Sequence, residues 1–131
     1  MAGQIFEFVD FRGLIRHEIG EMLRMREDQR KITIMFFEHN KGESVVKVLK
    51  DALRTCDVIF HRDEVFFVVM PLTDKEGAMH VARTLEEYFG EDVKDVNATW
   101  PEDGLSEEEL LTNFAQYIRT KCHLDLWQML E

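Results

Sequence analysis

Hydrophobic residues near the start of the chain recur at the spacing of an amphipathic helix. Asp10 can cap this helix, and the apolar side chains that follow fall three or four residues apart. They are Phe11, Leu14, Ile15, Ile19, Met22 and Leu23. The run Ile32–Phe37 has a different pattern, because it is continuously apolar and rich in β-branched and aromatic residues. That composition predicts a strand covered on both faces.

The middle of the chain predicts a second helix followed by an antiparallel hairpin. Valine and leucine side chains recur with helical spacing over residues 45–53. Two apolar runs, 57–60 and 65–70, then flank a short polar stretch, which is the pattern of a hairpin. Pro71 is expected to end the second strand, because proline cannot donate to a ladder.

The last third predicts a helix, a strand and a closing helix. Asp74 can cap the first of these helices, and Gly90 stands just past its end. A weaker strand is expected over Val93–Thr99. Ser106 and Glu109 form a capping box for the closing helix, which carries a buried apolar stripe.

After the first helix, the order of elements is β-α-β-β-α-β-α. The first six elements form the split βαβ pattern of a ferredoxin-like α+β sandwich. We therefore predict a mainly antiparallel sheet of about four strands with helices on one face, an extra N-terminal helix and C-terminal helices. The expected divisions are an N-terminal amphipathic helix in 1–30, a core domain in 31–121 and a tail in 122–131. A short docked helix is expected at residues 121–131.

Length and charge narrow the classes of function. A chain of 131 residues with 45% hydrophobic and 32% charged residues fits one globular domain. Its net charge of −10 argues against binding to nucleic acid or to an anionic membrane, which needs a basic face. Residues 74–109 hold twelve acidic and only three basic side chains, which indicates either a solvated flank or a docking surface for a basic partner. Two cysteines and no long apolar run favour a reduced, cytoplasmic setting.

Two polar loops are where chemistry is expected. One follows the first strand of the core and contains Glu38 and Lys41; the other is the hairpin tip, with Arg62 and Glu64. A β-α-β-β arrangement places these loops side by side, so Glu38 and Glu64 (or Asp63) are candidate ligands for Mg²⁺, the ion that paired carboxylates hold against a triphosphate. The alternative is that these are all ordinary solvated residues. Isolated glycines exclude a Walker A loop, and the histidines do not stand at zinc-binding spacing with the cysteines.

Three segments, 65–78, 97–104 and 110–121, match parts of one family in order and spacing. They are similar to the signature strand with its following helix, to the last strand with its "YPEDG" turn, and to the closing helix. Over residues 31–121 the chain resembles a diguanylate cyclase-type GGDEF domain in a shortened and degenerate form. The resemblance implies the cyclase-palm version of the ferredoxin-like sandwich.

Departures from the family pattern lead to the prediction that the chain is not an enzyme. The signature hairpin reads Arg-Asp-Glu-Val-Phe over 62–66, or His-Arg-Asp-Glu-Val over 61–65, so both glycines that let the backbone approach a nucleotide are replaced. Glu38 and Asn40 stand where the family has aspartates. The segment before the hairpin is also shorter than the family's by about four or five helical turns. We therefore expect no condensation of GTP.

Arg54 and Asp57 match the family's inhibitory RxxD motif, which implies binding of cyclic di-GMP. An arginine can stack on a guanine and bridge its acceptor edge, while an aspartate accepts from its donors. The alternative is structural: Arg54 interacts with the dipole at a helix end, and Asp57 opens a strand. Another nucleotide could instead bind near Lys41 and Arg62.

The function expected from the sequence is a non-catalytic signalling module of a bacterial cytoplasm that acts through protein–protein interaction, without a resident cofactor. The expected interaction surface contains Phe11, Ile15, Met22 and Trp127, with self-association through the N-terminal helix. That helix can equally pack on its own sheet. The alternatives are an effector that binds cyclic di-GMP or a nucleotide, and an enzyme of altered specificity that uses Glu38 and Glu64 with Mg²⁺.

Overall fold

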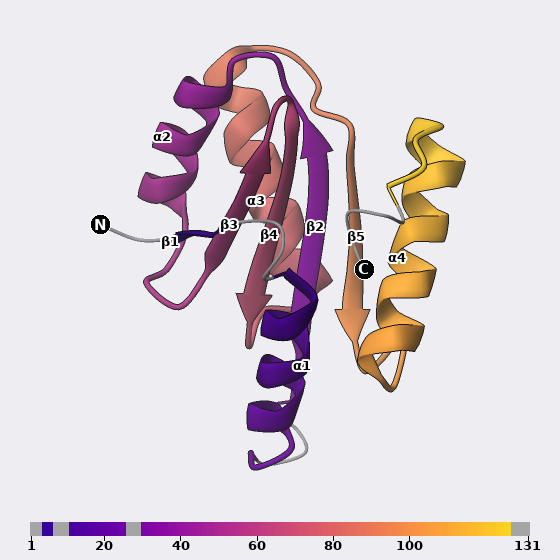
Figure 1. The fold of residues 1–131 in the computed structure, drawn as a ribbon. Helices are drawn as coiled ribbons and strands as arrows, with labels where there is room; N and C mark the ends of the chain where they lie inside the picture. The colour runs from indigo at the N-terminus through magenta and orange to yellow at the C-terminus, as the bar shows by residue number, and fades with distance from the viewer. Residues whose placement is uncertain (1–3, 7–10, 26–29, 127–131) are drawn as a thin grey trace.

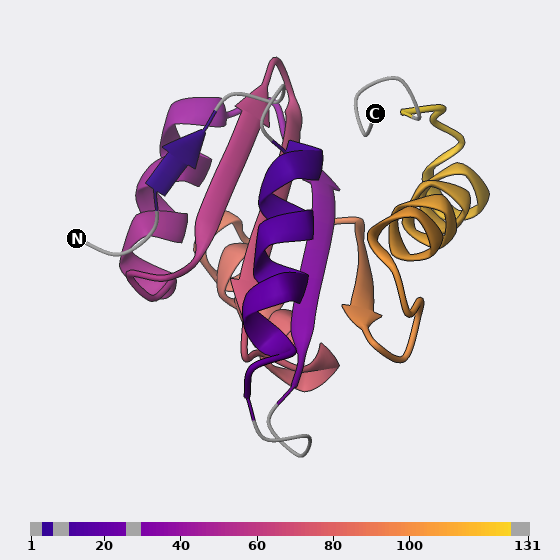
Figure 2. The same cartoon turned by 60° about the horizontal axis from the view of Figure 1, so that its bottom comes forward.

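A five-stranded sheet forms the middle layer of the molecule, with helices on both faces (Figures 1 and 2). The computed structural model describes residues 4–6, 11–25 and 30–126. The strands, which lie in the order β1-β3-β4-β2-β5, are β1 (Gln4–Phe6), β2 (Ile32–Glu38), β3 (Val58–Arg62), β4 (Val65–Pro71) and β5 (Asp95–Trp100). The helices are α1 (Phe11–Met22), α2 (Gly42–Ala52), α3 (Lys75–Phe89) and α4 (Glu107–Cys122).

Strand β2 lies in the centre of the ferredoxin-like arrangement that the sequence predicts. It pairs antiparallel with β4 on one side and with β5 on the other. Strand β3 pairs antiparallel with β4, so the predicted hairpin is present. The predicted α+β sandwich is therefore confirmed. The sequence did not predict β1, which pairs parallel with β3 at the sheet edge opposite to β5.

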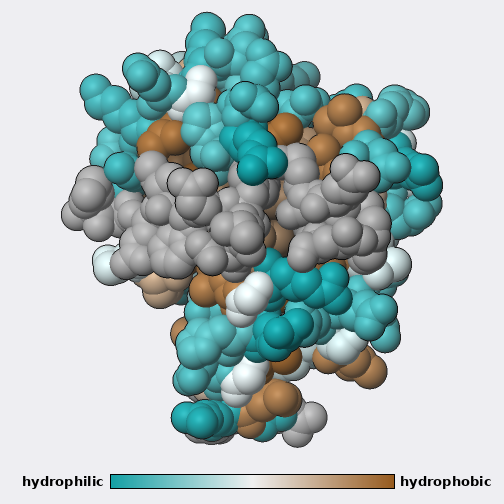
Figure 3. All heavy atoms as spheres, in the orientation of Figure 1, coloured by the Kyte–Doolittle hydropathy of each residue, from teal (hydrophilic) through white to brown (hydrophobic). Residues whose placement is uncertain are grey.

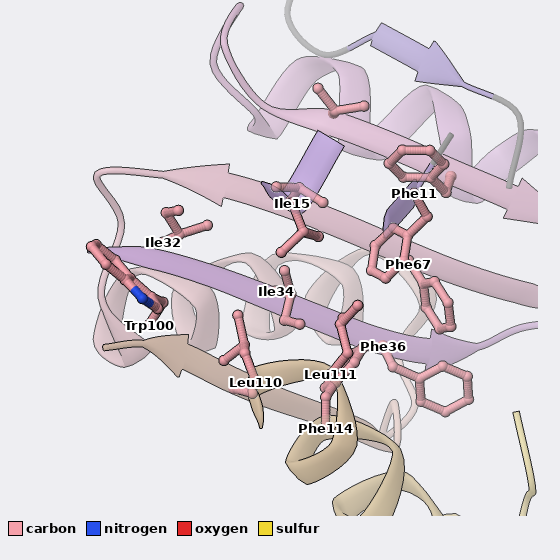
Figure 4. Packing of buried hydrophobic residues seen from close by; sticks show 14 of the residues in the cluster. Phe11, Ile15, Ile32, Ile34, Phe36, Phe67, Trp100, Leu110, Leu111 and Phe114 are labelled. Atoms are coloured by element: carbon pink, nitrogen blue, oxygen red, sulfur yellow. The ribbon is translucent and has the colours of Figure 1, made fainter. Parts of the chain in front are cut away.

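Alternation along the central strands produces two hydrophobic cores, one on each face of the sheet. Ile32, Ile34 and Phe36 of β2 point to the face that α1 and α4 cover (Figure 4). Met35 and Phe37 point to the opposite face, which α2 and α3 cover. The buried run in β2 is thus covered on both faces, as its composition predicts. The prediction of helices on one face is wrong, because α1 and α4 build a second core.

Helix α1 packs on its own sheet, which is one of the two alternatives that its pattern left open. The ring of Phe11 lies 5.1 Å from that of Phe60 and 4.9 Å from that of Phe67, measured between ring centroids. On the polar side, Arg12 and Arg16 both form ion pairs with Glu107 at the start of α4. These contacts fix α1 in the same layer as α4.

The ends of α3 and α4 agree with the capping signals of the sequence, whereas Asp10, the predicted cap of the first helix, lies outside the described residues. Asp74 accepts a hydrogen bond from the Gly77 N–H at 3.0 Å, and Gly90 adopts the left-handed conformation just after α3. Ser106 accepts a hydrogen bond from the Glu109 N–H at 3.1 Å. None of the helices in the described ranges has the length and apolar character that a membrane span requires.

The tail follows its prediction only in its first residues. Helix α4 continues through Cys122, and His123 ends it in the left-handed conformation. Residues 123–126 are not helical, although Leu124 and Leu126 pack against the core. The rest of the predicted tail helix, with Trp127, lies outside the described residues.

Candidate functional site

The loop after β2, the tip of the β3–β4 hairpin and the start of α2 meet at one end of the sheet, at the top of Figure 1. Glu38, the last residue of β2, stands opposite Val65 in the ladder. The backbone N–H of His39 donates to the carbonyl oxygen of Glu64 at 2.9 Å. The structure thus brings the two predicted loops together, with both acidic side chains exposed. This end of the molecule is mainly hydrophilic (Figure 3).

The side chain of His39 links this end of β2 to the end of α3. Its Nδ1 accepts a hydrogen bond from the Lys41 backbone N–H at 3.1 Å, so Nε2 carries the proton in the neutral ring. Nε2 lies 3.0 Å from the Glu91 carboxylate, and the ring stacks on Phe89 at 4.3 Å between centroids. Only 7% of the His39 side chain is exposed. Both ring nitrogens therefore already have partners within the chain.

His61 occupies the space beside the first residue of α2. Its ring stacks on Phe66 at 4.1 Å between centroids, and its Nε2 lies 2.7 Å from the carbonyl oxygen of Asp63. A Cβ placed on Gly42 would lie 3.0 Å from the His61 Cε1 atom. Asp63 itself has a φ of 54°, so a non-glycine residue supplies the left-handed backbone of the turn. The turn therefore forms without the two glycines of the family signature.

This end of the sheet offers two exposed carboxylates and the N-terminus of a helix. Lys41 makes no side-chain capping bond to α2, and its Nζ lies 5.7 Å from the centroid of the Phe89 ring. Arg62 is the exposed last residue of β3. In the part of the chain that the structure describes, no group of three or more His, Cys, Asp or Glu side chains is placed to hold a metal ion. A Mg²⁺ site on Glu38 and Glu64 alone stays a prediction.

Arg54 and Asp57 lie together in the loop between α2 and β3. Asp57 accepts hydrogen bonds from the Arg54 backbone N–H at 2.8 Å and from its guanidinium at 2.9 Å. The guanidinium also donates to the Pro71 carbonyl oxygen and to Thr73 Oγ1, which ties this loop to the corner between β4 and α3. The hydrogen bond to Asp57 raises the pKa of Arg54.

The two residues of the RxxD motif differ in their access to a ligand. The Arg54 side chain is 47% exposed, whereas that of Asp57 is only 4% exposed. In this arrangement only Arg54 faces solvent, and the oxygens of Asp57 are already occupied by Arg54. Binding of cyclic di-GMP through this pair stays a prediction.

Three residues of the predicted interaction surface lie in the core. Phe11 and Ile15 are fully buried and Met22 is 4% exposed, because the apolar face of α1 packs on the sheet. The prediction that these side chains form an interaction surface is therefore corrected: α1 uses its apolar face within the chain. Trp127, the fourth predicted residue, lies outside the described residues.

A groove along the outer edge of β5 was not found from the sequence. It has a volume of about 500 Å³ and lies between α3 and α4. Its lining residues are Met79, Asp95, Val96, Asn97, Tyr117, Thr120 and Lys121. Only the apolar Met79, which stands off the buried stripe of its helix, gives a local signal. The open strand edge depends on strand order, which no local pattern encodes.

Asp103, in the turn that the sequence predicts after the last strand, accepts a hydrogen bond from the groove residue Tyr117. Its Oδ2 accepts from the Thr99 backbone N–H at 2.8 Å and pairs with Lys75, while Oδ1 accepts from the Tyr117 hydroxyl at 3.1 Å. Burial acts to raise the pKa of Asp103, but the hydrogen bonds from Lys75 and Thr99 outweigh it and lower the pKa.

Solved structures similar to this fold are GGDEF domains. The GGDEF domain of YfiN (TpbB) from Pseudomonas aeruginosa matches with a TM-score of 0.71 and 14% identity, over 91% of each chain. A DGC protein from Thermotoga maritima matches with a TM-score of 0.64 and 20% identity, over 86% of this chain and 95% of that one. The diguanylate cyclase SiaD of P. aeruginosa, solved in complex with its activator SiaC, matches with a TM-score of 0.56 and 15% identity, over 86% of this chain and 54% of that one. No family model and no curated protein matches the sequence.

The chain therefore has the fold of a GGDEF domain, as the resemblance implies. The prediction that the chain is not an enzyme is contradicted by these neighbours, since the fold is that of diguanylate cyclases. The loss of both glycines was one physical reason for that prediction. Asp63 nevertheless forms the left-handed turn, and the end of β2 still meets the hairpin.

Proposed function

We propose that this chain is a signalling module of the GGDEF fold that acts by binding a protein partner through its acidic side, by which we mean the exposed acidic residues of segment 74–109. The proposal rests mainly on the uneven charge: residues 74–109 carry twelve acidic and three basic side chains of the chain's total. Among these acids, Glu87, Asp92 and Glu108 are exposed, and no other residue that the structure describes forms a hydrogen bond or ion pair with their carboxylates. Exposed charges of one sign steer a partner of opposite charge and are weakened by salt. The SiaD complex supports the proposal by showing a protein of this fold with a protein activator.

The test compares two charge-matched triple variants. E87Q/D92N/E108Q removes three acids from the acidic side, and E21Q/E43Q/D51N removes three exposed acids elsewhere. The full-length chain is cross-linked in its source cells, the captured protein is purified, and its affinity for each variant is measured by calorimetry. We expect the first variant to weaken binding at least tenfold and the second to change it less than threefold. Equal effects of both variants, or no purified protein that binds, would contradict the proposal.

A second candidate function is binding of cyclic di-GMP or another nucleotide. The observation that favours it is the half-exposed guanidinium of Arg54, which Asp57 and Thr73 hold in a fixed orientation. A fixed, planar guanidinium can stack on a base and donate to its acceptor edge. Lys41 and Arg62 at the hairpin end are the other basic residues proposed for a nucleotide, with Glu38 and Glu64 for Mg²⁺.

Calorimetry with cyclic di-GMP and with GTP, each in the presence of Mg²⁺, tests this candidate. Heat with cyclic di-GMP that disappears in Arg54→Ala supports a receptor role. Heat with GTP that disappears in Glu38→Gln and Glu64→Gln supports a nucleotide site at the hairpin end. No heat with either ligand would contradict the second candidate and would leave the protein-partner proposal unaffected.

A further inference from the structure

The hydrogen bonds of the Thr99 backbone show which residues of β5 turn their N–H and C=O groups outward, away from the neighbouring strand β2. The Thr99 N–H donates to Asp103 Oδ2 at 2.8 Å, and the Thr99 carbonyl oxygen accepts from the Asp103 N–H at 2.7 Å. Thr99 therefore turns its backbone groups away from β2. Its side chain contacts that of Thr33 at 2.8 Å between Oγ1 atoms, as expected for a cross-strand pair without backbone hydrogen bonds.

Alternation along the strand places Asp95 and Asn97 on the same outer side as Thr99. The register between β2 and β5 is continuous from one end to the other, so no bulge interrupts this alternation. Lys121 donates to the outward carbonyl oxygen of Asp95, and Asp103 occupies both outward groups of Thr99. Within the described ranges, nothing bonds to the outward N–H and C=O of Asn97, and no strand lies beyond β5 (Figure 2). We call the segment Asp95–Asn97 the open edge.

Helix α3 on one face of the sheet and helix α4 on the other face line the groove at the open edge, and this arrangement can hold an extended peptide. Met79 of α3 and Tyr117 of α4 line the groove and are 52% and 37% exposed. Side chains of an added strand alternate between the two faces of the sheet. One set would therefore contact Met79 and the other set Tyr117. A strand edge between two apolar walls is the geometry by which sheets bind peptides as an added strand.

Acidic residues outnumber basic ones in the sequence on both sides of β5. Glu87 and Asp92 precede the strand, Glu108 and Glu109 follow it, and all four are exposed; the basic residues at the Asp95 end are Lys94, also exposed, and Lys121, which lines the groove. A second copy of this chain, paired antiparallel about Asn97, would bring the acids that precede one β5 towards those that follow the other. Like charges oppose that pairing, whereas lysine or arginine at the ends of a bound segment would be attracted.

We propose that the open edge binds an extended segment of a protein partner, with apolar residues at its centre and lysine or arginine near both ends. The segment adds to β5 as a further strand and bonds to the N–H and C=O of Asn97. This inference rests on the proposed function and deepens it by naming the surface and the chemistry of the partner.

A nine-residue peptide is the probe for the test. It has two lysines at each end, alternating valine and threonine between them, and blocked termini. It is titrated into the ¹⁵N-labelled full chain and followed by NMR. Asn97→Pro removes the outward N–H without removing a bond to β2, and Asn97→Val keeps that N–H. We expect the Asn97 amide to shift and its hydrogen exchange to slow, and binding to weaken at least tenfold in Asn97→Pro and less than threefold in Asn97→Val.

A fully N-methylated peptide provides a control that does not depend on the stability of Asn97→Pro. It cannot donate to β5, so it should not bind the wild-type chain. Absence of binding by the unmodified peptide up to millimolar concentration would overturn the inference, as would equal binding by the methylated one. Sedimentation showing a dimer that Asn97→Pro dissociates would also overturn it and would assign the edge to a second copy. A purified partner that depends on the acidic side but not on Asn97 would refute this inference and leave the proposed function standing.

Discussion

At the hairpin end of the sheet, both ring nitrogens of His39 have partners, and His61 fills the space beside Gly42. Along β5 the backbone groups of Asn97 point outward, and nothing among the described residues bonds to them. The first region is the one in which the sequence predicts chemistry, whereas the second begins a segment that resembles the family's last strand and for which the sequence predicts no binding role.

The two regions differ in whether their polar groups are already bonded within the chain or can still bond to a ligand. Polar groups that are already bonded within the chain must lose those bonds before they can bind a ligand, which costs free energy. Asp57 is the clearest case, because Arg54 engages its buried carboxylate. The outward groups of Asn97 lose only water when a strand is added. A motif match therefore marks residues with the right chemistry, and the structure decides which of them still have free bonding capacity.

The largest effect is expected from removing Asp57. Asp57→Ala leaves the Arg54 backbone N–H without its acceptor and removes the carboxylate that orients the Arg54 guanidinium, the group that donates to the β4–α3 corner. We expect a loss of about 2–3 kcal/mol in the free energy of unfolding, measured by urea denaturation. Asp51→Ala, at an exposed position of α2, is the matched control and should change stability by less than about 0.5 kcal/mol. Equal effects of the two variants would show that the RxxD pair is not held by internal bonds.

Asp103 and Asp95 lie near the two ends of β5. Replacing each by asparagine should change the free energy of unfolding in opposite directions at neutral pH. The pKa of Asp103 is lowered below its ordinary 3.8, so its stabilising effect is complete above that value and is lost as the pH falls through the lower, folded-state pKa. Asp103→Asn should cost about 1–2 kcal/mol at neutral pH, and the cost should decrease as the pH falls below 3.8.

Burial raises the pKa of Asp95 above 3.8, so the folded state favours its neutral form. The resulting stability is present at low pH and is lost as the pH rises through the folded-state pKa. Asp95→Asn should therefore stabilise the chain slightly at neutral pH, within about 0.5 kcal/mol, and have no effect at pH 3. Urea denaturation at neutral pH and at pH 3 measures the free energy of unfolding of both variants. A change of the same sign in both variants at neutral pH would contradict the opposite pKa shifts of Asp103 and Asp95.

A double-mutant cycle sharpens the description of the hairpin end. A methyl group on Gly42 would press on His61, which its stacking on Phe66 holds in place. We expect Gly42→Ala to destabilise the chain by about 0.5–1 kcal/mol. In a His61→Ala background the same change should be neutral or stabilising, because alanine favours the helix. Additive effects, measured by thermal and urea denaturation, would show that His61 does not fill this space.

The sequence predicts those elements whose signals are local. Asp74, Gly90 and Ser106 mark helix ends through bonds within a few residues, and the apolar run of β2 encodes burial directly. Strand β1 was missed because three residues carry little periodicity and its partner is distant in sequence. The hydrophobic pattern of α1 predicts that one face of the helix is buried. It does not predict whether the sheet of the same chain or another molecule covers that face.

The candidate site was predicted less completely because it depends on contacts between distant segments. The loops of Glu38 and Glu64 could be placed together from the order of elements alone. The role of Arg54 depends on Pro71 and Thr73, which lie beyond the hairpin in sequence. The outward direction of Asn97 follows only once the register of β5 and the bonds of Asp103 are known.

Amide hydrogen exchange of the full chain without any ligand tests the central claim most directly. The account predicts an alternating pattern along β5: slow exchange at Val96 and Ala98, which bond to β2, slow exchange at Thr99, which bonds to Asp103, and fast exchange at Asn97. Protection of Asn97 equal to that of Val96 and Ala98 would show that another group already occupies its N–H. In that case β5 would have no open edge, and the contrast with the hairpin end would not exist.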